Sequence, residues 1–304
     1  MRVLLLVNTT AASVTARKRV VIRKALSADH DVEVAETSRR GHAMRLARAA
    51  ANDGVDVVAV LAGDGTLNEA ADGLAGTTTA LAPLPGGSTN VYARTIGVPT
   101  DLVEATGALL ASLERRSFRR IGLGTAGARR FLFHAGLGFD AAVIRRVERS
   151  GELKRYAAHP LYVLAALDTW WRGYDRSRPH FDLVLDGGAR VERVLFAVVS
   201  KTTPYTYLGN RPIHLAPEAG LETALSLTAF RRLDAVTLLA GAASAMRSGA
   251  FLRRRRGVVH RSGLTTVTVE GARPFPHQVD GDDLGDAESL QIRYEPAALT
   301  LAVP

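Results

Sequence analysis

One stretch decides the fold: Val57-Val58-Ala59-Val60-Leu61-Ala62-Gly63-Asp64-Gly65-Thr66-Leu67-Asn68-Glu69. Its β-branched, apolar first half predicts a buried strand that ends at Gly63. Apolar residues at positions 67, 70, 71 and 74 then have the spacing of a helix. A strand that turns directly into a helix aims unpaired backbone N–H groups and the positive end of the helix dipole at one point. The stretch therefore predicts a site for a phosphate group.

The residues at this turn indicate phosphoryl transfer. Gly63 and Gly65 are expected to let the backbone approach a ligand closely, and Thr66 adds a hydroxyl in the first helical turn. A carboxylate at Asp64 repels a phosphate unless it binds a metal ion or takes up a proton. We therefore name Asp64 as a candidate catalytic residue and Mg²⁺ ligand. The alternative is a plain strand–helix turn with an aspartate cap, since neither a Walker P-loop nor the dinucleotide fingerprint fits.

Length and composition bound the remaining choices. At 304 residues the chain is long enough for two domains, which we place at 1–118 and 119–304. The absence of cysteine excludes disulfides and thiolate metal sites. The N-terminal apolar run is too short for a signal peptide, and no run approaches the ~20 apolar residues that span a bilayer. We therefore expect a cytoplasmic protein.

Arginine clusters carry the net charge of +9. Such a balance suits nucleic acid, acidic substrates or an anionic membrane surface. We expect no nucleic-acid partner, because no finger, RRM-like or helix-turn-helix pattern accompanies the charge. Transient, peripheral contact with an anionic membrane surface is the expectation that remains. The clusters lie at 115–120, 129–130, 145–146 and 253–256.

The first half of the chain alternates strands and helices. This order is typical of parallel βαβ units, so we predict an α/β, Rossmann-like three-layer domain that binds ligands beyond the carboxyl ends of its strands. The strands are predicted at 3–7, 32–36, 57–62 and 80–84. The helices are predicted at 15–27, from 43 to near Gly54, and at 101–116.

A second glycine-rich turn follows the strand at 80–84. It reads Pro85-Gly86-Gly87-Ser88-Thr89-Asn90 and also opens a helix. Because the carboxyl ends of neighbouring parallel strands meet at one edge of a sheet, we expect the two glycine turns to converge on one site. Ser88 contributes a hydroxyl there or, as the alternative, caps the following helix.

Short strands separated by turn residues fill the second half. This pattern predicts an antiparallel β-sandwich with helical insertions. We expect strands at 121–124, 130–135, 181–185, 191–200, 223–230, 267–270 and 290–294, and insertions at 140–150, 154–172 and 233–250.

Several strings resemble the diacylglycerol kinase catalytic domain, which sphingosine kinases and bacterial lipid kinases share. They are the two glycine turns, Gly136-Leu137-Gly138-Phe139-Asp140 and Asp280-Gly281-Asp282. The resemblance covers most of the chain and implies a nucleotide-binding domain, with the tail at 296–304 packed back on it, and a β-rich lipid-substrate domain. It also implies a kinase that uses ATP and Mg²⁺ to phosphorylate a lipid alcohol, by default diacylglycerol to phosphatidic acid. A homodimer is left open.

The same resemblance assigns roles by position. Asp282 stands where the family has a glutamate that serves as the base, and its side chain is one methylene shorter than glutamate. Asp280 shares the role if Asp282 does not reach the proton of the acceptor hydroxyl. Asp64 binds the catalytic Mg²⁺ or orients the lipid hydroxyl, and both roles stay open. The residues expected at the nucleotide with Asp64 are Asn8, Thr37, Gly63, Gly65, Thr66, Asn68, Glu69, Gly87, Ser88 and Asn90.

Departures from the family pattern keep other functions open. Ala62 replaces a glycine, and Val91 replaces the aspartate of an Asn-Asp pair. Ala219 stands where relatives have an aspartate that helps bind a structural Mg²⁺, and we expect no family-like metal site there even with Glu218 and Glu222 nearby. The alternatives are an NAD kinase-like enzyme, which shares the Gly-Asp-Gly-Thr turn, and a catalytically inactive homologue that binds lipid or nucleotide.

Overall fold

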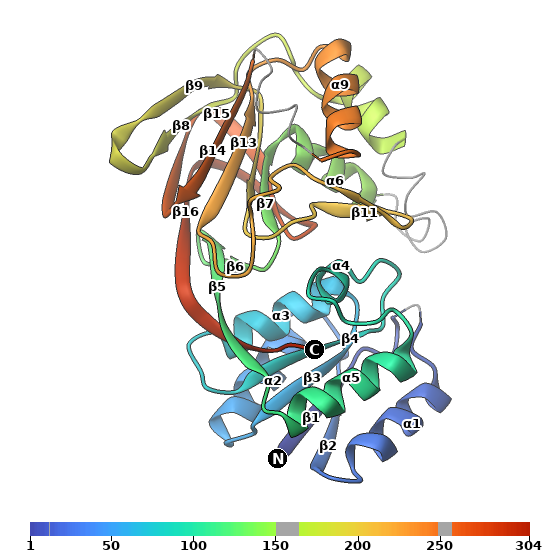
Figure 1. Cartoon of the computed structure of the whole chain (residues 1–304). Coiled ribbons are helices and arrows are strands. Elements are labelled where there is room, and N and C mark those ends of the chain that lie inside the picture. Colours follow the sequence, from blue (N-terminus) through green and yellow to red (C-terminus); the bar gives the residue numbers. More distant parts are fainter. Residues whose placement is uncertain (12, 150–163, 249–256) are drawn as a thin grey trace. The chain divides into compact units, whose positions relative to one another are not determined.

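The computed structural model describes residues 1–11, 13–149, 164–248 and 257–304. These residues form two compact units, drawn in Figure 1. The first is Met1–Leu123 with Pro296–Pro304, and the second is Gly124–Glu295. The arginine cluster at 253–256 and most of the insertion expected at 154–172 lie outside the described residues.

A parallel sheet forms the centre of the first unit, as the alternation of elements predicts. Strands β1 (Arg2–Val7), β2 (Asp31–Glu36), β3 (Val57–Ala62) and β4 (Ala80–Pro85) pair in the order β4-β3-β1-β2. All of these pairings are parallel. β3 and β4 are buried along their whole length because helices cover both faces.

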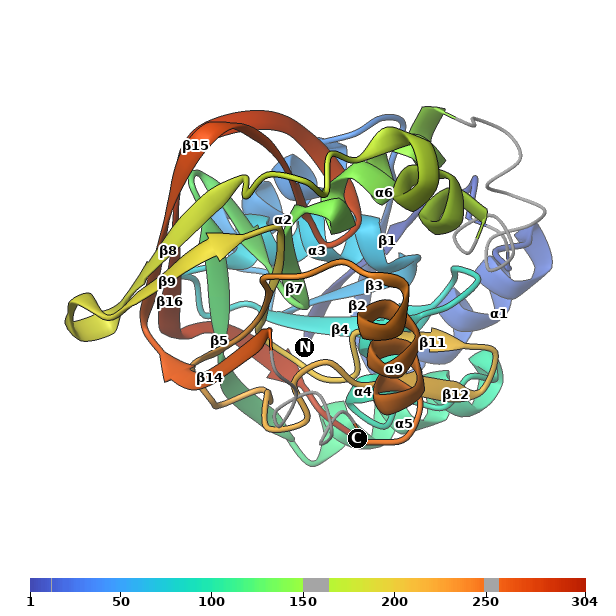
Figure 2. The same cartoon turned by 90° about the horizontal axis from the view of Figure 1, so that it is seen from above.

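The helices of the first unit form the outer two layers (Figures 1 and 2). α1 and α5 pack together on one face of the sheet, and α2 and α3 pack together on the other. The Rossmann-like α/β prediction is confirmed. The bounds are α1 (Ala16–Leu26), α2 (His42–Asn52), α3 (Asp64–Leu74), α4 (Val91–Thr95) and α5 (Leu102–Glu114).

A strand from the far end of the chain adds to the same sheet. β16 (Asp282–Ala302) ends with Thr300 and Leu301 paired in parallel to Ala80 and Leu81 of β4. The last residues of the chain are therefore part of the first unit.

The second unit is antiparallel. It begins with the last residues of β5 (Phe118–Ala126), most of which lies in the first unit. Its other strands before β16 are β6 (Arg129–Phe131), β7 (His134–Gly138), β8 (Phe181–Leu185), β9 (Arg190–Val194), β10 (Phe196–Ser200), β11 (Thr206–Leu208), β12 (Arg211–Ile213), β13 (Leu225–Phe230), β14 (Val258–Leu264) and β15 (Thr266–Val279). They run in the order β14-β13-β10-β7-β15-β16, and β8 and β9 form a hairpin on β15. Aromatic side chains such as Phe131, Phe181 and Phe275 fill the core between these strands.

Several predicted strands of this unit have different bounds in the structure. The strand expected at 130–135 is two strands, because a turn at 132–133 separates β6 from β7. The strand expected at 191–200 is also two, because Leu195 leaves the ladder and its N–H donates to the Phe230 carbonyl (2.9 Å). β15 and β16 extend far beyond 267–270 and 290–294, with register shifts where Pro274 and Pro276 interrupt the alternation.

Helical segments are few in the second unit. They include α6 (Phe139–Arg149), α9 (Ala235–Ala245) and a π-helical turn at Thr169–Gly173. Among the described residues, no helix has the length and apolar character needed to cross a membrane.

The packing of α2 on α3 depends on Gly73. A Cβ at this position would lie 2.3 Å from the Met44 carbonyl oxygen of α2. The carboxylate of Glu69, one turn earlier in α3, accepts a hydrogen bond from the Ala43 N–H (3.3 Å) at the start of α2. α3 therefore both packs against α2 and satisfies one of its N-terminal donors.

We expect Gly73→Ala to lower the free energy of unfolding by about 1–3 kcal/mol, because the added methyl group forces the two helices apart. The matched control is Gly107→Ala in α5, where the Cβ would meet none of the described atoms within 4 Å. This change should raise stability by about 0.5–1 kcal/mol through helix propensity. Urea unfolding followed by circular dichroism measures both. Equal effects of the two substitutions would contradict the close α2–α3 contact.

Candidate functional site

The two glycine turns of the first unit meet backbone to backbone. A Cβ on Gly87 would lie 2.7 Å from the Cα of Gly63, and one on Gly86 would lie 2.7 Å from the Ala62 nitrogen. The Gly86 N–H also donates to the Ala62 carbonyl (3.0 Å). A Cβ on Gly65 would meet none of the described atoms within 4 Å, and the close approach of Gly65 to a ligand stays a prediction. The tight contact is made by Gly86 and Gly87, and open space remains beside Gly65.

Asp64 joins the first turn to the helix of the second. Its two carboxylate oxygens accept hydrogen bonds from the N–H groups of Val91 (2.9 Å) and Tyr92 (3.1 Å) at the start of α4. Burial raises the pKa of the Asp64 carboxyl, and these two hydrogen bonds oppose that rise. Gly63 is the N-cap residue of α3 and makes no side-chain cap bond, so the first-turn N–H groups of α3 are available to a ligand.

Asn90 closes the second turn. Its side-chain oxygen accepts from the Gly87 N–H (2.8 Å), and its side-chain nitrogen donates to the Gly87 carbonyl (3.0 Å). Asn90 itself has a left-handed backbone (φ 48°) and holds the N-cap position of α4. The alternative that Ser88 caps this helix is therefore wrong. Ser88 lies exposed on the turn.

Asn8 and Thr37 follow the carboxyl ends of β1 and β2. The Asn8 side-chain nitrogen donates to the Thr66 hydroxyl (3.1 Å) and so connects the loop after β1 to the first turn of α3. The Thr37 N–H donates to the Val7 carbonyl (2.9 Å). The residues after β1, β2, β3 and β4 thus lie along one edge of a parallel sheet, where such sheets bind ligands.

Two residues predicted at the nucleotide lie deeper in α3. Asn68 is 1% exposed and Glu69 is 9% exposed. The contact of Glu69 with the Ala43 N–H belongs to the packing of α3 on α2. Glu69 therefore has a role in the packing of α3 on α2. Its contact with a nucleotide stays a prediction.

Asp280 and Gly281 form the turn between β15 and β16. Their positive φ angles (47° and 85°) and the pairing of Val279 with Asp282 describe a two-residue hairpin turn, which an Asp-Gly pair favours. The buried Asp280 carboxylate accepts three backbone N–H bonds of 2.8–3.0 Å. Burial raises the pKa of Asp280 to about 7 despite these bonds. The donors are Leu132, Phe133 and His134.

Asp282 and Asp283 have different surroundings at the start of β16. The Asp282 carboxylate lies 3.3 Å from an Arg129 nitrogen, and its side chain is 25% exposed. Arg145 donates to both oxygens of Asp283 (2.8 and 3.1 Å). Asp282 therefore has the more accessible carboxylate, whereas Asp283 is held in a two-point ion pair.

Asp140 is a buried carboxylate that the sequence did not single out. It accepts hydrogen bonds from the Tyr205 hydroxyl (2.5 Å) and the Gln278 side-chain nitrogen (2.6 Å). The Gln278 side-chain oxygen accepts in turn from the Gly281 N–H (2.8 Å). Burial raises the pKa of Asp140. Asp140 closes the Gly-x-Gly-Phe-Asp string, which was the one available signal, but its partners are distant in sequence.

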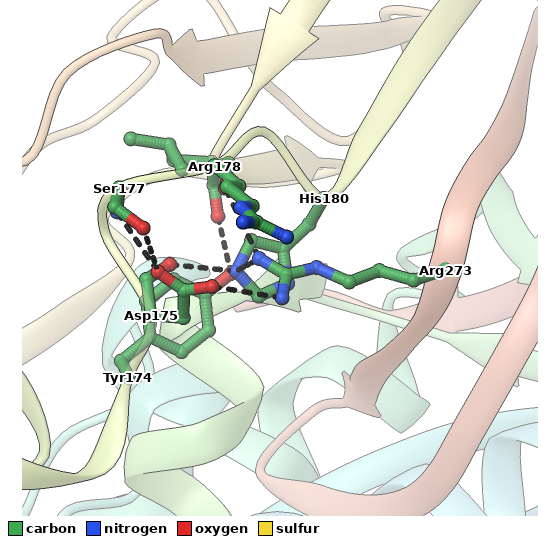
Figure 3. A network of polar contacts seen from close by, with 7 residues as sticks. Tyr174, Asp175, Ser177, Arg178, His180 and Arg273 are labelled. Atoms are coloured by element: carbon green, nitrogen blue, oxygen red, sulfur yellow. Dashed lines mark hydrogen bonds and ion pairs between the residues drawn. The ribbon is translucent and has the colours of Figure 1, made fainter.

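A polar network around His180 serves the fold (Figure 3). The ring stacks on Tyr174 with centroids 4.4 Å apart. Arg273 of β15 donates to the Asp175 carboxylate (2.9 Å) and to the Arg178 carbonyl (3.1 Å). These contacts fix the segment before β8 to β15. Within the described part of the chain, no group of three or more His, Asp or Glu side chains could hold a metal ion.

Comparisons with known proteins agree with this architecture. Residues 2–124 match the model of the diacylglycerol kinase catalytic domain, and residues 134–303 match the model of the YegS C-terminal NAD kinase beta sandwich-like domain. Two crystal structures from Bacillus anthracis that carry the name diacylglycerol kinase have TM-scores of 0.72 and 0.76. Both cover 100% of this chain and 97% of their own, at 19% and 22% identity, so they support the fold alone.

Sequence relatives carry the name "Probable lipid kinase YegS-like". One from Pseudomonas putida is 28% identical over 90% of this chain and 85% of its own length. Another, from Chromohalobacter salexigens, is 34% identical over 50% of this chain. The chain spans about half (49%) of the length of that second relative.

Glycine turns at the strand ends of a parallel sheet, followed by an antiparallel β unit, are the architecture of this family. The chain belongs to the diacylglycerol kinase catalytic-domain family and carries the YegS C-terminal domain.

His134 gives this region a pH-dependent stability. Burial lowers the pKa of His134 from its ordinary value of 6.5 to about 3. Below pH 6.5 the unfolded chain takes up a proton that the folded chain does not, so stability falls as the pH falls. We expect His134 to account for a loss of about 3 kcal/mol between pH 7 and pH 4. His134→Gln should remove this share.

Urea unfolding at a series of pH values, followed by tryptophan fluorescence, measures the effect. Both tryptophans, Trp170 and Trp171, lie in the second unit with His134. Parallel pH curves for the wild-type and His134→Gln proteins would show that His134 is not kept neutral by the fold.

Proposed function

We propose that the protein transfers the γ-phosphoryl group of ATP to the hydroxyl of a membrane lipid, with diacylglycerol as the acceptor. The observation that carries the proposal is the backbone contact between the turns at Gly63 and Gly87, which places the uncapped start of α3 beside open space at Gly65. The family membership and the names of the relatives support a lipid as the acceptor.

The first unit supplies the donors for the nucleotide phosphates. The first-turn N–H groups of α3 and the Thr66 hydroxyl are hydrogen-bond donors at the edge of the sheet. The helix dipole adds partial positive charge at the same place. Mg²⁺ bound with ATP would supply positive charge beside the phosphate oxygens. Asp64 is the residue that would hold this ion or orient the acceptor hydroxyl. Its two N–H bonds fix the carboxylate and leave further lone pairs for such a partner.

Asp282 is the proposed base in the second unit. A base must reach the proton of the acceptor hydroxyl, and Asp282 has a partly exposed carboxylate. Asp280 does not suit this role, because three backbone N–H groups occupy its buried carboxylate. We assign Asp280 and Asp140 to positioning the hairpin that carries Asp282.

Two departures from the family pattern are compatible with an active enzyme. Val91 contributes its backbone N–H to Asp64, a contact that any side chain at 91 except proline would allow. Ala62 lies inside β3, where an alanine methyl group needs no special backbone angles. These contacts favour a working kinase over an inactive homologue.

The proposal predicts a lipid product. Purified protein incubated with radiolabelled ATP, Mg²⁺ and mixed micelles that contain diacylglycerol should give label that partitions into chloroform. Label on added NAD instead would identify an NAD kinase-like enzyme. ATP binding without turnover on any lipid would identify an inactive homologue.

Asp282→Asn should lower turnover in this assay by about 100-fold or more, with little change in ATP affinity, because only proton transfer is removed. The matched control is Asp286→Asn, whose carboxylate is 51% exposed and pairs with Arg145 (2.8 Å). An unchanged rate for Asp282→Asn would remove Asp282 as the base.

An exposed apolar stripe on α9 suits contact with an anionic membrane. Val236, Leu239 and Met246 lie along one side of this helix and are 66%, 72% and 45% exposed. α9 contains no charged residue. Exposed arginines flank it at 231, 232 and 247. An apolar helix face between cations is the arrangement that binds the surface of an anionic bilayer, and we propose that α9 brings the enzyme to its lipid from the cytoplasmic side.

Leu239→Glu should lower the fraction of protein that sediments with phosphatidylglycerol-containing vesicles by about tenfold, because it removes an exposed leucine from the proposed membrane contact and adds an anion. The control is Val103→Glu on α5, which is 71% exposed in the first unit. Equal binding of the two variants would exclude α9 as the membrane surface.

A further inference from the structure

Lys201 is a buried cation for which the proposed reaction has no use. It follows β10 and is 1% exposed. Its ammonium donates to the carbonyls of Gly220 (2.6 Å) and Leu221 (3.0 Å). The Tyr294 ring lies on another side, 5.5 Å from the ammonium to the ring centroid, within cation–π range. Lys201 therefore sits in a small cage of carbonyl oxygens and one aromatic ring.

The carbonyls of this cage belong to the loop in which the family pattern implies a structural Mg²⁺. Ala219, which replaces the aspartate of relatives, directly precedes Gly220. Glu218, one of the remaining carboxylates, is in hydrogen-bond contact with the His260 ring. The loop thus presents carbonyl oxygens to a cation. Glu218 before them already contacts His260, and the negative charge of Glu222 after them favours the ammonium form of Lys201.

The residues present do not fit a divalent metal ion. Mg²⁺ requires near-octahedral oxygen ligands at about 2.0–2.1 Å, most often with a carboxylate among them. At Gly220 and Leu221 the ligand already in place is the Lys201 ammonium, which also repels a second cation. Burial lowers the pKa of Lys201 to about 8, so the ammonium form still predominates at neutral pH.

We propose that the Lys201 ammonium replaces the structural metal ion in this protein. It holds the 216–223 loop in its folded arrangement, so that the loop needs no bound divalent cation. The ammonium supplies the positive charge and the directed bonds to carbonyl oxygens that a metal would supply. Mg²⁺ is then needed only with ATP. This inference concerns the fold and goes beyond the proposed kinase activity.

The position of Lys201 connects the loop to the predicted catalytic hairpin. The Lys201 N–H donates to the Phe133 carbonyl (2.7 Å), and the Phe133 N–H donates to Asp280 (3.0 Å). Asp280 forms the turn directly before Asp282. The backbone of Lys201 is therefore bonded to the segment that holds the turn before the proposed base, while its ammonium is bonded to the 216–223 loop.

Thermal unfolding of the full-length, nucleotide-free protein tests the inference. Tryptophan fluorescence reports on the second unit alone, because Trp170 and Trp171 both lie there. We expect the wild-type midpoint in excess EDTA and in millimolar Mg²⁺, at matched ionic strength, to agree within about 1 °C. A midpoint several degrees higher with Mg²⁺ or Ca²⁺ would overturn the proposal. No lipid or ATP is present, so failure of the kinase proposal does not affect this result.

The variant that tests the lysine itself is Lys201→Met, which keeps most of the volume and removes the charge. The midpoint should fall by about 5 °C or more, because two buried carbonyls lose charge-assisted hydrogen bonds. The matched control is Lys24→Met on the exposed surface of α1, which should leave the midpoint unchanged. An unchanged midpoint for Lys201→Met would overturn the proposal. If Lys201→Met does not fold, Lys201→Gln, which keeps N–H donors, is measured in its place against the same two outcomes.

Discussion

The contact between the turns after β3 and β4 is the constraint on which the candidate site depends. A side chain at Gly86 or Gly87 would collide with the backbone at Ala62 or Gly63, so only glycine lets the two strand ends lie this close. The contact sets the ends of both strands at one level and brings the starts of α3 and α4 together. Asp64 then spans the two helix starts with its two N–H bonds. One close approach thus determines where the first-turn N–H groups of α3 and the Asp64 carboxylate lie.

Most of the positioning in both units is done by backbone groups. Asp64 and Asp280 accept only backbone N–H groups in their described hydrogen bonds, and the Lys201 ammonium donates to backbone carbonyls. Backbone groups are present whatever the side chain, so replacements such as Val91 leave such contacts unchanged. Motif departures at backbone-bonded positions therefore carry less weight than a change such as Glu to Asp at 282, where the side chain itself is proposed to react.

The first half of the fold could be predicted because each element has its own local signal. β3, the Gly63 turn and α3 are marked by residues adjacent in sequence, and parallel pairing follows from the βαβ order. The hairpin at Asp280 was also predictable from its Asp-Gly pair. Contacts between distant segments could not be predicted from local patterns. They are the hydrogen bonds of Asp280 to the backbone at 132–134, the partners of Asp140, and the carbonyls around Lys201. The helix cap at Asn90 in place of Ser88 required a left-handed backbone that the sequence alone does not show.

The peptide units at Phe133 show how these distant contacts combine. Asp280 accepts the Phe133 N–H, and the N–H groups of Lys201 and Thr202 donate to the Phe133 carbonyl. The Asp280 side chain therefore bonds to the N–H of Phe133, and the backbone of the segment that carries Lys201 bonds to the Phe133 carbonyl. Burying a charged group is costly, and here backbone N–H groups compensate Asp280, whereas backbone carbonyls and the nearby charge of Glu222 compensate Lys201. The backbone of the segment at 201–202 and the side chain of Asp280 thus meet at one residue, and the Asp280 turn directly precedes Asp282. The carboxylate of Asp282 can be placed only as well as the turn beside it is held.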